Sequence, residues 1–220
     1  MDHISFDELL EMTATGCPKP AMRSVELARS YGVKLHVRSA FSWVPGTWVS
    51  EEPSMENAII SAVTHDTSEA KMTVSGVPDQ PGVAAKLFRS LADADVNVDM
   101  IVQNVSDAGA TDISFTLPHK QVSAATATVD ALVAEIGAKG VVTDTGIGRV
   151  SLTGAGMQTN PGVAATMFET LSTSGINIEM ISTSAIRISC VVREDQAEQA
   201  VTVLHAAFEL DKAPANRSDI

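Results

Sequence analysis

The sequence predicts an α+β fold with two copies of a β-α-β-β-α-β unit, the ferredoxin-like or split β-α-β arrangement. The stretch from Pro81 to Ile101 (PGVAAKLFRSLADADVNVDMI) returns eighty residues later from Pro161 to Ile181 (PGVAATMFETLSTSGINIEMI), and ten of its twenty-one positions are identical. This period is far longer than a solenoid repeat, so each copy is expected to form a small domain. In both copies, alternating apolar and polar stretches flank segments whose apolar residues recur every three or four positions, which is the pattern of strands around helices.

The first copy is predicted to contain four strands and two helices. Alternation predicts strands at 70–76, 96–106, 111–117 and 140–146, and the middle two surround a DAGA turn. The sequence PDQPG separates the first strand from the first helix. The apolar helix faces comprise Ala84, Leu87, Phe88 and Leu91 in the first helix, and Val122, Ala125, Val129, Leu132, Val133 and Ile136 in the second.

The second copy repeats this order but lacks its last strand. Strands are predicted at 149–156, 176–184 and 186–192, and the chain then ends in a polar tail at 211–220. An unpaired apolar stretch, AIISAVTHD at 58–66, precedes the first copy, and we expect it to supply the missing strand. The first module, 67–147, would then be inserted in the second, which is 58–66 plus 148–210. The helix faces of the second copy are Ala164, Met167, Phe168 and Leu171, and Ala197, Val201, Leu204 and Phe208.

Residues 1–50 follow a different pattern. SFDE at 5–8 predicts a capping box before an apolar helix. PAMRSVELARSYG predicts a second helix with Gly32 as its C-cap. VKLHVRSAF at 33–41 predicts a strand, and a polar linker is expected at 51–57. This α-α-β piece is expected to bury too little apolar surface when alone, so it is interpreted as a fragment of a larger α/β domain or as a piece that packs on a partner.

The composition argues against several function classes. The formal net charge is -12 and no basic run occurs, whereas nucleic-acid binding needs clustered Lys and Arg. No apolar stretch is long enough to span a bilayer, and MDHISFDELL lacks the features of a signal peptide, so we expect a cytoplasmic protein. Cys17 and Cys190 are expected to be reduced. Neither the cysteines nor the histidines have the spacing of a metal site, and we expect no cofactor. The histidines are His3, His36, His65, His119 and His205.

Several stretches resemble the paired ACT domains of aspartate kinase. They are THDTSEAKMTVSGVPDQPGVAAKLFRSLADADVNVDMIVQNVS in the first copy, and GRVSLTGAGM, NPGVAA and INIEMISTSAIRIS in the second. This resemblance covers about 55–210. ISFDELLEM and RSVELARSYGVKLHVRSAFSWVPGT are similar to the end of the kinase domain of the same family. The resemblance implies the nested arrangement of modules, a remnant of an amino-acid-kinase domain at 1–50, and a likeness to the small regulatory subunit that some bacteria make.

No complete kinase site is expected in this sequence. Aspartate kinases begin with a phosphate-binding segment of the type Lys-Phe-Gly-Gly-Thr, and nothing here matches it or a P-loop. TGIG at 145–148 and TGAG at 153–156 are interpreted as turns, because glycine is the default turn residue. Phosphoryl transfer depends on positioning the nucleotide, so no catalytic residue is assigned. Turnover of ATP at another nucleotide site is the enzyme alternative.

The repeated Pro-Gly-Val-Ala-Ala loop is the strongest candidate site. A helix N-terminus offers free N–H groups to a carboxylate, Gly82 permits close approach of the backbone, and Asp79 can pair with an ammonium group. The residues alone slightly favour a plain strand–helix turn. The family resemblance implies that an effector amino acid binds here. By position, it places the first site at Asp79, Gln80, Gly82, Ala84, Asn97, Val98, Gln103 and Ser106.

The second copy departs from the family pattern at two positions. Ala164 stands where the family usually has threonine, and Ala185 stands where it has glutamate. A charge-assisted hydrogen bond is worth about 1.5–3 kcal/mol, so losing these groups weakens recognition of a charged effector such as lysine. We therefore expect threonine at the first site more than any effector at the second. By position, the second site comprises Asn160, Pro161, Gly162, Val163, Asn177, Ile178, Ser182 and Ser184.

The resemblance implies feedback control of aspartate phosphorylation in lysine, threonine and methionine biosynthesis. The open sheet edges of such modules favour pairing, so we expect a homodimer through the ACT modules. Trp43 and Trp48 are expected to face a catalytic aspartate kinase chain. A stand-alone or degenerate ACT sensor with another partner is the alternative, which Ala164 and Ala185 favour.

Overall fold

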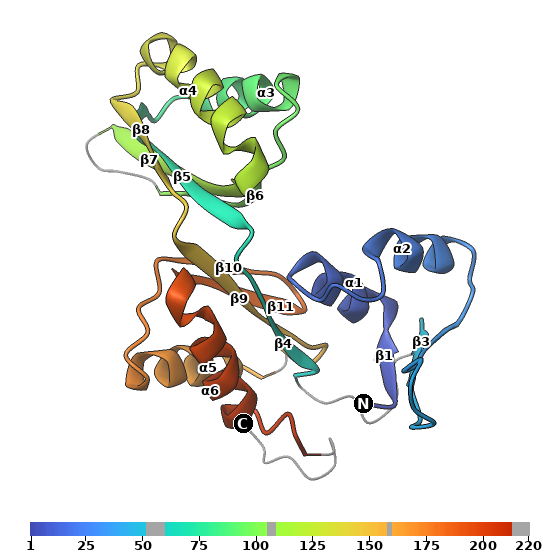
Figure 1. The fold of residues 1–220 in the computed structure, drawn as a ribbon. Coiled ribbons are helices and arrows are strands. Elements are labelled where there is room, and N and C mark those ends of the chain that lie inside the picture. The colour runs from blue at the N-terminus through green and yellow to red at the C-terminus, as the bar shows by residue number, and fades with distance from the viewer. Residues whose placement is uncertain (52–59, 105–108, 158–159, 213–220) are drawn as a thin grey trace. The chain divides into compact units, whose positions relative to one another are not determined.

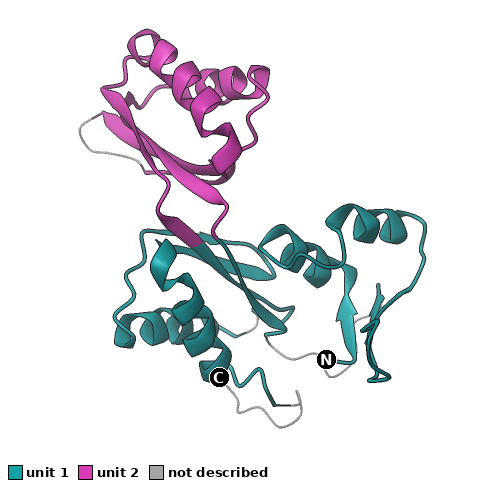
Figure 2. Ribbon diagram, in the orientation of Figure 1, with its two compact units in different colours: residues 1–66, 149–220 teal, residues 67–148 magenta. Residues whose placement is uncertain are grey.

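The computed structural model describes residues 1–51, 60–104, 109–157 and 160–212. The chain divides into two compact units, one of residues 67–148 and the other of residues 1–66 with 149–220 (Figure 2). Each unit contains one four-stranded sheet, and the larger unit also holds a three-stranded sheet. No helix in the described ranges is long and apolar enough to cross a membrane.

The unit of residues 67–148 is one four-stranded antiparallel sheet with the strand order β6-β7-β5-β8. Both helices, α3 and α4, cover the same face of this sheet (Figure 1). The chain order is β-α-β-β-α-β, as the sequence predicts. The elements are β5 (Glu69–Pro78), α3 (Val83–Asp93), β6 (Asp99–Gln103), β7 (Ala110–Pro118), α4 (Val122–Ile136) and β8 (Gly140–Asp144).

The core of this unit lies between the sheet and the two helices. Phe115 on β7 is fully buried, and its ring meets that of Phe88 edge to face with centroids 5.5 Å apart. The predicted helix faces are confirmed, since all their residues belong to this cluster or pack against it. The predicted strand at 96–106 is too long at its start, because Val96 donates its N–H to Leu91 O (2.9 Å) and so still closes the helix.

The second four-stranded sheet has the order β10-β11-β9-β4. β4 (Ala62–Asp66) pairs antiparallel with β9 (Ile147–Thr153), and Asp66 lies opposite Arg149. The prediction that the stretch at 58–66 pairs with the second copy is confirmed for the described part of that stretch. The other elements are α5 (Gly162–Thr173), β10 (Met180–Thr183), β11 (Arg187–Arg193) and α6 (Ala197–Ala207).

Helices α5 and α6 form the other layer of this module. Met167, Leu171 and Leu204 are fully buried against Val150 and Leu152 of β9. Phe208 is buried in the same cluster but lies one residue beyond the end of α6. The predicted strand at 176–184 begins only at Met180, because Ile176 donates to Leu171 O (2.9 Å), just as Val96 does in the first copy.

Residues 1–50 form two helices and a small three-stranded sheet with the order β1-β3-β2. The capping box is confirmed, since Glu8 N donates to Ser5 Oγ and Ser5 N donates to Glu8 Oε2, both at 3.2 Å. Gly32 (φ +63°) was predicted as the C-cap, but Tyr31 occupies that position and Gly32 follows it. The elements are β1 (His3–Ser5), α1 (Phe6–Ala14), α2 (Met22–Ser30), β2 (Leu35–Val37) and β3 (Thr47–Ser50).

Parts of the sequence predictions need correction or lie outside the described residues. β1 and β3 were not predicted, and the strand predicted at 33–41 shrinks to Leu35–Val37. The linker expected at 51–57, the tail at 211–220 and the start of the stretch at 58–66 fall wholly or mainly outside the described ranges, as does Ser106.

Candidate functional site

The loop that joins β5 to α3 carries the first predicted site. Gly82 is the N-cap of α3 and adopts φ +96°. Residues with a Cβ adopt this left-handed backbone conformation only at a cost in free energy. The loop is fixed where it leaves the sheet, because Asp79 N donates to Gly109 O at 3.1 Å. Asp79 and Gln80 are exposed, so both side chains are accessible to a ligand beside the start of α3.

Gln103 lies at the same end of the sheet as this loop. It is the last residue of β6 and pairs with Ile113, and Pro78 at the end of β5 pairs with Ala110 on the same strand β7. The antiparallel register therefore places the loop, Gln103 and the start of β7 at one sheet end. Ala84 follows in the first turn of α3.

Asn97 and Val98 lie at the opposite end of this sheet. They immediately precede β6, whose first residue Asp99 pairs with Thr116. Asn97 N donates to Gln121 Oε1 (3.1 Å), which fixes this segment to the start of α4. The structure thus separates the predicted first site into a loop group (Asp79, Gln80, Gly82, Ala84 and Gln103) and an Asn97–Val98 group within one module.

The corresponding loop of the second module differs in its backbone. Pro161 is the N-cap of α5, and Gly162 is already the first helical residue, so the left-handed conformation of Gly82 has no counterpart at this position. The two glycines of the repeat therefore differ in backbone conformation. Asn160 Nδ2 donates to Gly156 O (2.9 Å), so one amide donor of this predicted site residue is already engaged. Val163 is buried in the core.

Ser182 and Ser184 lie at the turn from β10 to β11. Ser182 is on β10, opposite Ser189, and Ser184 N donates to Arg187 O (2.8 Å) to close the turn. Both serines are in the half-buried or exposed classes. Ala185 is exposed within this turn, so the position at which the family usually has a carboxylate faces solvent.

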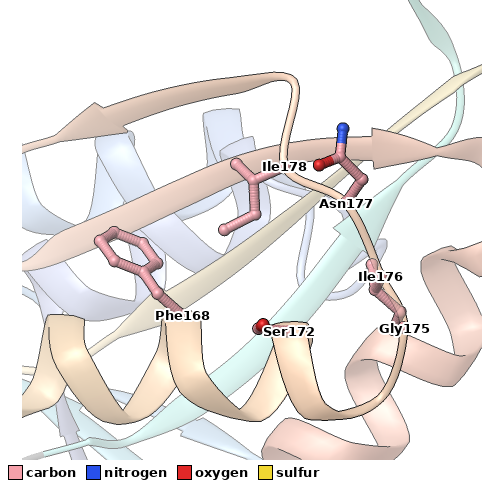
Figure 3. A pocket seen from close by; sticks show the side chains of 6 residues that line it. All are labelled: Phe168, Ser172, Gly175, Ile176, Asn177 and Ile178. Carbon is pink, nitrogen blue, oxygen red and sulfur yellow. The ribbon is translucent and has the colours of Figure 1, made fainter.

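Asn177 and Ile178 line an open hollow of about 480 Å³ at the other end of this sheet (Figure 3). Phe168 and Ser172 contribute from α5, and Gly175 and Ile176 from the segment that follows it. Figure 3 shows the Phe168 ring beside the Ile178 side chain, with the Asn177 amide at the rim. The volume suits a small ligand. No lining side chain is charged, so the ammonium and carboxylate groups of an amino acid would need partners from another surface.

The prediction of a turn is confirmed for the part of TGAG beyond Thr153, whereas in TGIG only Thr145 and Gly146 lie in a bend, because Ile147 and Gly148 already belong to β9. In TGIG, Gly146 N donates to Asp144 Oδ1 (2.9 Å), and in TGAG, Gly154 N donates to Ile186 O (3.0 Å). These N–H groups are therefore already engaged and are not directed at a phosphate. Within the described ranges, no three His, Cys, Asp or Glu side chains are grouped as metal ligands would be.

Comparison with known proteins identifies the family. A model of the ACT domain matches residues 72–132 and 150–208. An aspartokinase of Mycolicibacterium smegmatis is 50% identical over 215 residues, which make up 96% of this chain and 51% of that protein. In a crystal structure of aspartokinase alpha and beta subunits, a 42% identical chain superposes with a TM-score of 0.65, over 69% of this chain and 99% of that one. The chain belongs to the aspartate kinase family.

Within that family it corresponds to the regulatory part with two ACT domains. The ligand-free regulatory subunit of aspartate kinase from Thermus thermophilus is 37% identical and superposes with a TM-score of 0.65, over 68% of this chain and 99% of that subunit. The chain spans about half the length of the curated aspartokinases it matches. The predicted resemblance to the regulatory region of aspartate kinase is therefore confirmed.

Proposed function

We propose that the chain binds a free amino acid, threonine before lysine, and passes the binding state to an aspartate kinase catalytic part. The observation that carries this proposal is the loop at the start of α3. It combines the left-handed Gly82 with the exposed carboxylate of Asp79 at the N-terminus of α3, which has no side-chain cap. A zwitterionic ligand needs both a carboxylate partner and an ammonium partner, and this loop supplies both kinds.

The separation of Asn97 and Val98 from this loop shapes the proposal. One module presents the loop group at one sheet end and Asn97–Val98 at the other. We infer that a complete site forms where the loop end of one module meets the Asn97–Val98 end, or the corresponding Asn177–Ile178 hollow, of another copy. The uncharged lining of that hollow supports this arrangement. The site would then be built at a homodimer interface through the ACT modules, together with Ser106.

The second site is proposed to be weak. Ala164 and Ala185 remove a hydroxyl and a carboxylate, and Asn160 already bonds to Gly156 O. Binding there would rest on Ser182 and Ser184 of one copy and on Asn177 and Ile178 of another, because these two pairs lie at opposite ends of the sheet. The same losses support the alternative function, a stand-alone or degenerate ACT sensor whose partner is not an aspartate kinase.

We further propose that the first module, 67–147, is inserted in the second, 58–66 plus 148–210. The pairing of β4 with β9 supports this arrangement. Residues 1–50 are proposed to be the end of a kinase domain, joined by the linker at 51–57. In support, the M. smegmatis aspartokinase matches 96% of this chain, whereas the subunit structure covers 69%.

The apolar surface of residues 1–50 supports docking to a catalytic part. Phe41 is fully exposed, Trp43 is 94% exposed and Tyr31 is 77% exposed. Large exposed apolar side chains that gather in one segment mark an interaction surface. Trp48 is less available than the sequence predicts, because its ring stacks on His36 with centroids 4.0 Å apart. The chain by itself is proposed to lack kinase activity and to act in the cytoplasm.

Calorimetric titration of the chain with threonine, and then with lysine, tests the proposal. We expect saturable heat with threonine that Asp79→Ala and Gln103→Ala abolish. Asp130→Ala, which removes an exposed carboxylate from α4 of the same module, is the matched control and should bind normally. Absence of heat with both amino acids would overturn the proposal. Binding without any effect on an added aspartate kinase catalytic chain would favour the stand-alone sensor.

A further inference from the structure

The sheet β10-β11-β9-β4 has a buried polar face in addition to its apolar one. Val150 and Leu152 of β9 point toward α5 and α6, so the alternating residues Arg149, Ser151 and Thr153 lie on the opposite face. All three are at most 1% exposed. The same alternation places Arg187 and Ser189 of β11 on this face. Ser151 Oγ and Ser189 Oγ are 2.7 Å apart.

Helix α1 lies on this polar face, on the side of the sheet away from α5 and α6 (Figure 1). Arg149 Nη2 donates to Ala14 O (3.0 Å), and Arg187 Nη1 pairs with Glu11 Oε2 (2.9 Å). Thr15 Oγ1 and Thr64 Oγ1 are 2.8 Å apart. Ser61 Oγ also donates to Glu8 Oε1. The chain after α1 lies close against β4, because a Cβ on Gly16 would overlap His65 O.

The apolar side chains of α1 belong to another core. Phe6 and Leu9 pack with Val25, Ala28 and Val49 of residues 1–50, and neither belongs to the cluster around Val150 and Leu152. Two separate apolar cores therefore meet through a layer of hydrogen bonds and ion pairs, which we term the polar seam (Glu8, Glu11, Ala14, Thr15, Thr64, Arg149 and Arg187).

A polar seam can open at a smaller cost than a shared apolar core. Polar groups that lose a partner when the seam opens regain hydrogen bonds to water, so the net contribution of each contact is small. Both apolar cores remain intact when α1 leaves the sheet, because neither contains residues of the other. The seam therefore has the properties of a reversible joint.

One contact of the seam adjoins the predicted second effector site. Arg187 forms the ion pair with Glu11, and its carbonyl oxygen accepts the N–H of Ser184 (2.8 Å). A ligand held by Ser182 and Ser184 would therefore act within three residues of the guanidinium that holds α1. Gly154 N also donates to Ile186 O (3.0 Å), which links this turn to the end of β9.

We propose that the polar face of the second ACT sheet is a docking surface for α1, and that Arg187 is the positioning residue through which the β10–β11 turn sets the placement of residues 1–50. This inference rests on the proposed function for the identity of the ligand. The docking itself depends only on the contacts described above.

Hydrogen exchange of the full chain tests the docking without a ligand. We expect Arg187→Gln to speed amide exchange in Phe6–Ala14 at least fivefold while α6 keeps its protection. Arg193→Gln is the matched control, because Arg193 lies on the same strand and pairs with Glu179 (3.2 Å). The charge-exchanged double variant Arg187→Glu with Glu11→Arg should restore protection of α1. Unchanged exchange of α1 in Arg187→Gln, or equal loss of protection in α6, would overturn the proposal.

Adding threonine or lysine tests the coupling. If calorimetry shows binding, we expect the exchange rate of α1 to change at least twofold in the original chain but not in Arg187→Gln. Binding with no change in α1 would refute the positioning role of Arg187. If neither amino acid binds, the proposed function fails, and the exchange experiment without ligand still decides whether α1 docks on this face.

Discussion

Replacing the same repeat position in the two modules should have opposite effects on stability. Gly82 adopts φ +96°, and no heavy atom lies within 4 Å of a Cβ added there, so alanine would cost only backbone strain. Left-handed backbone costs about 1–2 kcal/mol for a residue with a Cβ. Gly162 is the first residue of α5, where alanine is favoured over glycine in a helix by about 0.5–1 kcal/mol. Gly82→Ala and Gly162→Ala should therefore differ by about 2 kcal/mol.

Hydrogen exchange in the full chain can measure each module separately. Amides of β7 report on the first module and amides of β11 on the second. Gly82→Ala should speed exchange in β7 by roughly 5- to 30-fold, whereas Gly162→Ala should slow exchange in β11. Two variants that shift stability in the same direction would refute the reasoning, because the argument depends on the different backbone conformations of two glycines in the same sequence context.

Four further outcomes are expected. Phe115→Ala should lower the free energy of unfolding by about 3–5 kcal/mol in urea titrations, because the ring is fully buried. Ser5→Ala removes the acceptor for Glu8 N and should cost about 1 kcal/mol, visible as faster exchange at the start of α1. Burial raises the pKa of Cys190 from 9.0 to about 12. At pH 8 a disulfide reagent should therefore modify Cys17 in the folded chain, and Cys190 only after unfolding. Because the unfolded thiol ionises first, the stability contributed by the neutral Cys190 thiol is present below pH 9 and declines as the pH rises toward about 12. Unfolding titrations at pH 8 and pH 10 check this sign. If the original chain lost no more stability between the two pH values than Cys190→Ala does, the expected sign would be contradicted.

The repeated modules could be predicted because each helix and strand has a strong apolar period. Leu87 and Leu91 recur with helical spacing, and their respective counterparts Met167 and Leu171 are equally buried. The strands β1 and β3 could not be predicted, since three or four residues are too few to show alternation. The edge strands β6 and β10 were predicted to begin too early, because Val96 and Ile176 resemble strand residues but donate their N–H groups to the preceding helix.

The sequence could indicate the loop of the first site but not its geometry. Gly82 and Gly162 occupy identical Pro-Gly-Val-Ala-Ala contexts, yet only Gly82 is left-handed, because α5 begins one residue earlier in the repeat than α3. The burial of Arg149 was also missed. An arginine that alternates with Val150 and Leu152 normally indicates a solvent-facing side of a strand, and only the three-dimensional structure shows α1 on that side.

The pairing of β4 with β9 has a consequence for how the chain is made. Asp66 and Arg149 are neighbours across the two strands although 83 residues separate them. Closing an unstructured loop of that length costs about 4 kcal/mol of entropy. A folded first module removes most of this cost, because the pairing of Lys71 with Asp144 already brings the two ends of that module together. At roughly 5–20 residues per second, a ribosome releases β9 about 4–17 seconds after β4. During that interval β4 waits without its partner strand while the inner module folds, so the nascent chain completes its domains from the inside outward.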